Sequence, residues 1–286
     1  MNNSVYTGHR ITQDQIADFT VYLRSREREA STIEAYLCNV RGFASWIGGA
    51  AVTKEAVMSW KEHLLSRRYT PATVNAKLAA LNAFFQFQGW EECRVKSLRL
   101  QRRVFRDPDR ELTRSEYDRL ITAAYGEGKT RLGLLMETIC ATGIRVSEVR
   151  YITVEAARSG AAEIALKGKI RTILLPSKLC RKLLKYAGKQ NNVSGEIFLT
   201  RTGKGMTRRQ IWAEMKAACK KAGVEPTKVF PHNLRHLFAK TFYKVSKDIV
   251  KLADVLGHSS VETTRIYLIS TGMEHARQLD SLGLVR

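Results

Sequence analysis

The sequence predicts a mainly α-helical protein of two domains, the second of which carries one small antiparallel β-hairpin. The 286 residues are about twice the roughly 150 residues of an ordinary domain. Apolar residues recur at helical spacing through most of the chain, and strand-like segments occur in one place. A basic run divides the helical segments into two groups. We therefore predict an N-terminal domain over 1–93, a basic interdomain linker over 94–110 and a second domain over 111–286.

Four amphipathic helices are predicted in the N-terminal domain, where they make a small bundle. Each follows a hydroxyl side chain that can cap the first turn. The capping positions are Thr12, Ser31 or Thr32, Thr53, and Thr70 before Pro71. Thr12 and Gln15 form a capping box, so the first helix is expected over about 13–27. Gly48 and Gly49 end the second helix.

The second domain is predicted to contain helices interrupted by a single hairpin. Thr113 and Glu116 form another capping box at its start, and the next helix, from about Leu132, is expected to end at Gly143. A change from helical spacing to alternation indicates strands at 163–166 and 171–175, on either side of a turn at residues 167–169. Further helices are expected at about 177–187, 208–222, 232–245, 247–256 and 261–269.

The excess of basic residues indicates a polyanionic partner. The chain has 48 Lys and Arg against 27 Asp and Glu, a formal net charge of +21, which favours nucleic acid. On charge alone, RNA and an anionic membrane surface stay open. No apolar run approaches the roughly 18 residues of a membrane span and no secretory signal is present, so a soluble, cytoplasmic protein is expected. The five cysteines, never spaced C-x-x-C, indicate neither a disulfide framework nor a thiolate zinc site.

Four short motifs in the second domain carry the functional signal when they are taken together. In chain order they are Thr142-Gly143-Ile144-Arg145-Val146-Ser147-Glu148, the hairpin Lys167-Gly168-Lys169-Ile170-Arg171, Pro231-His232-Asn233-Leu234-Arg235-His236, and Leu256-Gly257-His258 with Tyr267 nine residues later. This order resembles the tyrosine recombinase family of the phage integrase type. The resemblance implies a SAM-like core-binding bundle, a mostly helical catalytic domain, and site-specific DNA strand exchange by two domains that close around the duplex.

The resemblance implies integration, excision or inversion of DNA by a mobile element in a prokaryotic cell. Dimer resolution by the same chemistry is one alternative, which the lack of an extra arm-binding domain keeps open. A DNA-binding protein on the same scaffold that no longer cleaves is another, although all the expected catalytic side chains are present. Strand exchange of this kind is expected to need no cofactor, neither a metal ion nor ATP.

The residue types suit the cleavage of a phosphodiester. Arg145 and Arg235 can place planar guanidinium groups on the non-bridging oxygens and stabilise the extra negative charge of the transition state. Tyr267 is the implied nucleophile, which would form a 3′-phosphotyrosyl bond. Because tyrosine ordinarily has a pKa of about 10, it needs a proton acceptor or a positive local potential.

Three further side chains receive roles from the resemblance. His232 is the implied base, His258 a hydrogen-bond donor to the phosphate, and Lys167 the general acid that protonates the leaving 5′-oxygen. The hairpin is one residue shorter than the usual family form, so Lys169 stays open as the acid.

Each motif has a plainer interpretation when it stands alone. Gly143 followed by Arg145 can end one helix before another that Ser147 caps. His232 and His236 have the spacing of a zinc-binding pair, although no third ligand is evident. The basic linker can be a mobile connector rather than a strap on DNA. The joint order of the motifs favours the catalytic interpretation.

Double-stranded DNA at specific recombination sites is the expected partner. Polar or basic residues near helix starts and in the linker are candidate contacts. They are Thr73, Asn75, Lys77, Arg102, Arg103, Arg208, Arg209 and Gln210. The C-terminal segment places apolar residues at near-helical spacing between Met273 and Leu284. We expect it to pack on a neighbouring protomer and to couple a homo-tetramer to tyrosine placement, with docking on its own domain as the alternative.

Overall fold

The computed structural model divides the chain into two compact units, Met1–Arg102 and Arg103–Arg286. It describes residues 9–100, 108–166, 169–268, 276–277 and 279–284. Each unit has its own buried apolar core. Among these residues, no helix combines the length and apolar character that crossing a membrane requires.

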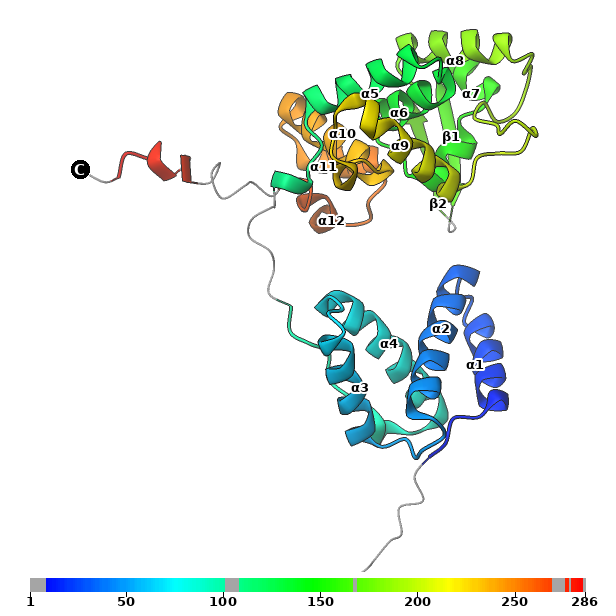
Figure 1. Cartoon of the computed structure of the whole chain (residues 1–286), viewed down its shortest axis with the longest axis vertical. Helices are drawn as coiled ribbons and strands as arrows, with labels where there is room; N and C mark the ends of the chain where they lie inside the picture. The colour runs from blue at the N-terminus through cyan, green and yellow to red at the C-terminus, as the bar shows by residue number, and fades with distance from the viewer. Residues whose placement is uncertain (1–8, 101–107, 167–168, 269–275, 278, 285–286) are drawn as a thin grey trace, which may run out of the picture. The chain divides into compact units, whose positions relative to one another are not determined.

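The N-terminal unit is the predicted bundle of four helices (Figure 1). They are α1 (Gln13–Ser25), α2 (Ala30–Ile47), α3 (Lys54–Ser66) and α4 (Pro71–Gln88). Buried aromatic rings fill its centre, among them Phe19, Phe43 and Phe84. The α2 helix begins one residue before the predicted caps, because the Glu29 carbonyl accepts its first backbone hydrogen bonds.

Two asparagines of α4 hold the chain that follows the bundle. Asn82 exchanges a pair of hydrogen bonds with the backbone of Val95, at 2.9 and 3.2 Å, and Asn75 does the same with Leu98, at 2.9 and 2.7 Å. Residues 94–98, predicted as the start of the linker, therefore pack on the N-terminal unit. The Asn75 amide, predicted to contact DNA, bonds the Leu98 backbone in this structure, and its contact with DNA stays a prediction.

The second unit is mostly helical with one two-stranded antiparallel sheet, as predicted (Figure 1). Its α-helices and strands are α5 (Arg114–Gly126), α6 (Thr130–Thr142), α7 (Val154–Ser159), β1 (Ala161–Leu166), β2 (Lys169–Leu174), α8 (Ser177–Lys189), α9 (Arg208–Ala222), α10 (Pro231–Ser246), α11 (Ile249–Leu256) and α12 (Val261–Arg265). Short 3₁₀ helices are η2 (Pro108–Arg110), η3 (Val146–Tyr151) and η4 (Pro226–Lys228). The α6 helix lies at the centre and packs against α5, α8, α9 and α10.

The hairpin differs in detail from its prediction. Strand β1 begins at Ala161, two residues early, because Ala162 packs into the core although alanine carries little strand signal. Leu166 pairs with Lys169, so Lys169 is the first residue of β2 and not part of the turn. Lys167, the predicted acid, lies outside the described residues.

The helix before Tyr267 is shorter than predicted. The α12 helix ends at Arg265, and the next amides bond three residues back, from Tyr267 to Thr264 and from Leu268 to Arg265. This tighter 3₁₀-type turn places Tyr267 two residues beyond the end of the helix rather than inside it.

Candidate active site

Gly143 sets the geometry at the end of α6. It adopts the left-handed conformation, with φ of +66°, that ends helices. A Cβ at this position would lie 2.4 Å from the Phe238 ring of α10, so only glycine allows the two helices to approach. The chain then turns into η3, where Arg145 and not Ser147 is the N-cap residue. The plainer interpretation of a helix capped by Ser147 is therefore wrong.

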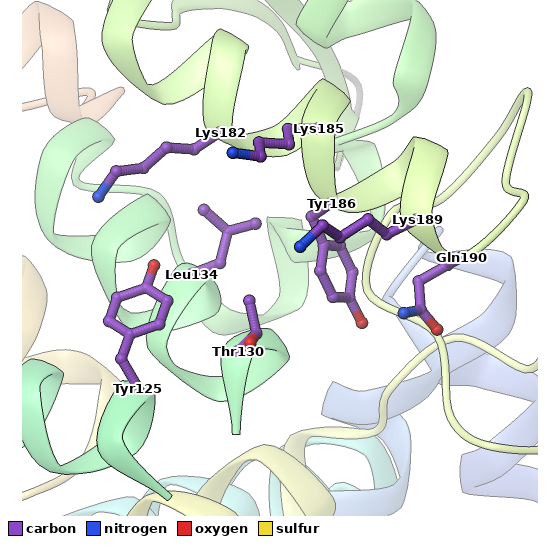
Figure 2. A pocket seen from close by; sticks show the side chains of 8 residues that line it. All are labelled: Tyr125, Thr130, Leu134, Lys182, Lys185, Tyr186, Lys189 and Gln190. Carbon is purple, nitrogen blue, oxygen red and sulfur yellow. The ribbon is translucent and has the colours of Figure 1, made fainter. Parts of the chain in front are cut away.

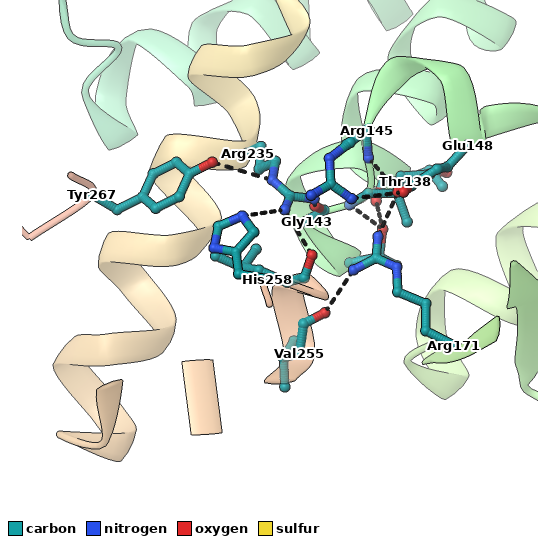
Figure 3. A network of polar contacts seen from close by, with 12 residues as sticks. Thr138, Gly143, Arg145, Glu148, Arg171, Arg235, Val255, His258 and Tyr267 are labelled. Carbon is teal, nitrogen blue, oxygen red and sulfur yellow. Dashed lines mark hydrogen bonds and ion pairs between the residues drawn. The ribbon is translucent and has the colours of Figure 1, made fainter. Parts of the chain in front are cut away.

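Arg235 is the buried centre of the site (Figure 3). It lies on α10 with 2% of its surface exposed. Its guanidinium donates to the carbonyls of Gly143 (2.5 Å) and Leu256 (2.8 Å) and contacts His258 Nε2 (3.0 Å). Its Nε–H also points to the Tyr267 hydroxyl, at 3.4 Å. Burial lowers the pKa of Arg235, but arginine stays charged in proteins.

Glu148 joins two arginines from the other side. Its carboxylate, 2% exposed, accepts from the backbone N–H of Arg145 (2.7 Å), from the Arg145 guanidinium (3.0 Å) and from Arg171 (2.5 Å). The sequence interpretation gave Glu148 no role, although its position three residues after Arg145 has the spacing of a capping residue. The Glu148 carboxylate therefore holds both the backbone and the side chain of Arg145 in place.

Arg171 connects the hairpin to the end of α11. It lies on β2, and its guanidinium also donates to the Val255 carbonyl at 3.2 Å (Figure 3). A Cβ at Gly257, whose φ is +64°, would lie 2.5 Å from the Arg171 side chain. The glycine of the Leu256-Gly257-His258 motif thus makes room for Arg171. Burial lowers the pKa of Arg171, and the Glu148 carboxylate opposes this effect.

Replacement of Glu148 tests this ion cluster. Glu148→Ala is expected to lower the free energy of unfolding by about 3–5 kcal/mol, because it leaves a largely buried arginine without its counter-charge. Chemical denaturation measures the change. Glu148→Gln retains one acceptor oxygen and is expected to lose less. Equal stability of Glu148→Ala and the wild type would contradict a structural role for the cluster.

His258 faces Arg235 and Thr264 with its two ring nitrogens. Nε2 lies 3.0 Å from the Arg235 guanidinium, and Nδ1 lies 2.8 Å from Thr264 Oγ1. Burial and the nearby arginines lower the pKa of His258 to about 4. A guanidinium can only donate, so a neutral ring accepts at Nε2 and donates from Nδ1 to Thr264. Both ring nitrogens are engaged within the protein in this state, and donation from His258 to the phosphate stays a prediction.

The lowered pKa of His258 makes stability depend on pH. An unfolded histidine has a pKa of about 6.5, so between pH 6.5 and about 4 the unfolded chain binds the proton and the folded chain does not. This contribution to stability is complete above pH 6.5 and is lost as the pH falls toward 4. Denaturation of the wild type and of His258→Gln between pH 7 and 5 is expected to show a steeper loss in the wild type. Parallel curves would contradict a buried neutral ring.

Tyr267 is buried, with 2% of its surface exposed. It packs in a small cluster with Leu252 and Leu256. Three histidine rings surround it: the ring centroids of His236, His258 and His232 lie 4.3, 5.7 and 5.9 Å away. The predicted nucleophile, the predicted base and both arginines are thus brought together from distant parts of the chain. His236, predicted to be packed or next to the phosphate, is nearer to the tyrosine than His232.

A cavity of about 360 Å³ opens beside these residues. Arg145, His232 and Arg235 line it, together with Arg208 and Trp212 of α9. Arg235 therefore contacts both the cavity and the tyrosine. The half-exposed Trp212 ring was not identified from sequence, because an isolated tryptophan in a helix gives no functional signal.

The remaining DNA-contact candidates have diverse positions. On α9, Arg208 lines the cavity and Arg209 is exposed, whereas Gln210 closes a capping box with Thr207. On α4, Thr73 forms a hydrogen bond with Thr70, and Lys77 forms one with Asn39, both within the N-terminal unit. Arg102 and Arg103 lie outside the described residues.

Comparison with known proteins identifies the family. The model of the phage integrase family matches residues 110–272, and that of the phage integrase N-terminal SAM-like domain matches residues 10–92. The chain is 29% identical over 271 residues to the tyrosine recombinase XerA of Thermococcus kodakarensis, covering 92% of this chain and 93% of the relative. It is also 29% identical over 283 residues to the tyrosine recombinase XerD of Caulobacter vibrioides, covering 91% and 92%.

Solved structures share the fold. A lambda integrase tetramer bound to a Holliday junction has a TM-score of 0.74 at 16% identity, covering 91% of this chain and 78% of the integrase. A XerH recombinase bound to its difH substrate has a TM-score of 0.68 at 18% identity, covering 93% and 84%. One family model spans residues 110–272, and a second model spans the helical bundle before it. The chain therefore belongs to the phage integrase family, the tyrosine recombinases.

Proposed function

We propose that this chain is a site-specific DNA recombinase that cleaves and rejoins strands through a 3′-phosphotyrosyl bond at Tyr267, without metal or ATP. The observation that carries the proposal is Arg235, which lines the cavity and bonds the Tyr267 hydroxyl at 3.4 Å. Arg145 lines the same cavity. Two guanidinium groups that line one cavity, one of them bonded to the hydroxyl, suit a phosphate that gains charge in its transition state.

The reaction transfers a phosphoryl group without net hydrolysis. The Tyr267 oxygen attacks phosphorus, the bond to the 5′-oxygen breaks, and the tyrosine proton passes to His232. Lys167, or Lys169, gives a proton to the leaving 5′-oxygen. Attack by a 5′-hydroxyl from another strand reverses these steps and rejoins the DNA. Because Tyr267 is 2% exposed, the turn after α12 has to move before the hydroxyl reaches the phosphate.

A covalent-adduct assay tests this function. A duplex site is selected by binding from a random pool, nicked near the cleavage position and incubated with the protein in EDTA. We expect a protein–DNA adduct whose peptide map places the bond on Tyr267. A protein that footprints the site but forms no adduct would be a binding protein only. An adduct that forms only with Mg²⁺ would contradict the proposed chemistry.

The proposal includes assembly as a homo-tetramer on double-stranded DNA. Support comes from the shared fold, since one solved relative is a tetramer bound to a Holliday junction. In the C-terminal segment, Leu279, Leu282 and Leu284 are 55–83% exposed, as expected of apolar side chains whose partner is another protomer. Met273 lies outside the described residues.

Removal of the tail tests this exchange. A chain that ends at Ser270 is expected to bind single sites but to lose the tetrameric complex and recombination. Electrophoretic mobility and recombination of a two-site plasmid measure the two effects. Normal assembly and recombination by the shortened chain would contradict the proposal.

The same chemistry serves integration, excision, inversion and dimer resolution. What differs between them is the placement of the two sites, on separate molecules or on one, and in direct or inverted orientation. Plasmids with each arrangement, compared in one recombination assay, determine which outcome this chain favours.

A further inference from the structure

One helix far from the catalytic cavity has a strongly basic exposed side. The inner side of α8 buries Leu179, Cys180, Leu183 and Ala187. Its basic residues follow one another at spacings of three or four, apart from the adjacent Arg181 and Lys182, so they form one stripe along the helix. They are Lys178, Arg181, Lys182, Lys185 and Lys189.

A cavity of about 360 Å³ lies beside this stripe, between α8 and helices α5 and α6. Figure 2 shows Tyr125 and Tyr186 on two sides of the cavity, with Leu134 between them. Lys185 and Lys189 extend from α8 along its edge. The cavity therefore has an apolar centre and a cationic rim.

The charges around this cavity do not cancel. At one end the Glu137 carboxylate accepts from Lys182, at 2.6 and 2.8 Å, and from the Tyr125 hydroxyl, at 2.8 Å. Among the residues that the structure describes, Lys185 and Lys189 have no acidic partner. The end of the cavity near these two lysines is therefore positively charged.

This surface is separate from the catalytic cavity. The two cavities share no lining residue. Within the second unit, Figure 1 places α8 at the opposite end from α12, which precedes Tyr267. A phosphate held by Arg145 and Arg235 therefore leaves the α8 stripe available for a different ligand.

We propose that the α8 stripe is a second DNA-binding surface, which holds the phosphates of a duplex segment outside the cleaved site. The stripe from Lys178 to Lys189 extends over roughly 16 Å at about 1.5 Å per residue. A duplex presents a phosphate about every 3.4 Å along each strand, so the stripe matches about five. Lys178 and Arg181 lie outside the cavity, which favours a continuous polyanion over a free nucleotide. This inference goes beyond the proposed function.

Two double variants test the proposal. Lys185→Gln with Lys189→Gln removes two charges from the stripe. Lys220→Gln with Lys221→Gln removes two exposed charges from the end of α9 and is the matched control. The dependence of binding on salt is measured for each full-length protein with excess non-specific duplex. In the α8 variant only, we expect the slope of log affinity against log salt to fall by about 0.9 for each phosphate that is no longer neutralised.

Lysine acetylation of the wild type gives an independent measurement. Excess duplex is expected to protect Lys185 and Lys189 from acetylation and to leave Lys220 and Lys221 reactive. Equal salt slopes for the two variants, or no protection of the α8 lysines, would overturn the proposal. Protection by a mononucleotide but not by duplex would also overturn it. Both assays measure binding alone, so a protein that formed no phosphotyrosyl adduct could still confirm this surface.

Discussion

Tyr267→Phe is expected to abolish the covalent protein–DNA adduct and to leave DNA binding close to that of the wild type. Phenylalanine keeps the ring that packs against His236 and Leu256 but has no oxygen to attack phosphorus. The variant loses one hydrogen bond, from Arg235 at 3.4 Å, so the free energy of unfolding should change by less than about 1 kcal/mol. Adduct formation on nicked DNA, binding and denaturation are measured on the same preparation.

Tyr243 provides the matched control. It lies on α10 and packs against the same small cluster as Tyr267. Tyr243→Phe removes a hydroxyl from this environment and is expected to keep full adduct formation. An adduct in Tyr267→Phe, especially one that maps to Tyr243, would show that the nucleophile is assigned to the wrong residue.

Because Tyr267 is buried, the turn that carries it must move before cleavage. The residue follows a helix of five residues and sits in a 3₁₀-type turn. Among the described residues, its cluster has three other buried members, Ala239, Leu252 and Leu256, whereas the main core of the unit contains more than thirty. A turn with so few buried neighbours opens at lower free-energy cost than the core. The tyrosine can therefore be sequestered in the free protein without a prohibitive cost to catalysis.

Local sequence signals account for most of the helices. Thr113 and Glu116 begin α5 as a capping box, and Gly143 ends α6, as predicted. The same signals fail where local and tertiary interactions compete. The end of α12 is an example, because Tyr267 leaves the helical pattern to pack between three histidine rings. Strand β1 is another example, because its first two residues, Ala161 and Ala162, join the sheet only by pairing with β2.

The order of the motifs predicted which residues form the candidate site. It did not predict the contacts between their side chains. Glu148 and Arg171 are twenty-three residues apart and meet at 2.5 Å, a contact that no spacing rule gives. The state of His258 likewise depends on burial and on three arginines from other segments. Asn75 is a further example, because its hydrogen bonds to the Leu98 backbone join residues that are distant in the sequence.

Arg235→Lys is expected to reduce both cleavage and stability. A lysine cannot donate in two fixed directions, so the carbonyls of Gly143 and Leu256 lose their partners. Each unsatisfied buried carbonyl costs about 1–3 kcal/mol. Loss of one preorganised donor to a developing anion typically lowers a rate by about 10²–10³-fold. Single-turnover cleavage at saturating DNA and chemical denaturation measure the two losses.

Arg145→Lys separates these two effects, because the arginines differ in burial. The Arg145 side chain is 43% exposed, so its ion pair with Glu148 contributes less than about 1 kcal/mol. We therefore expect Arg145→Lys to lose cleavage to a similar extent as Arg235→Lys but to unfold nearly like the wild type. If the two variants lost cleavage only in proportion to their stability, the arginines would be structural residues, and the assignment of transition-state stabilisation to them would be wrong.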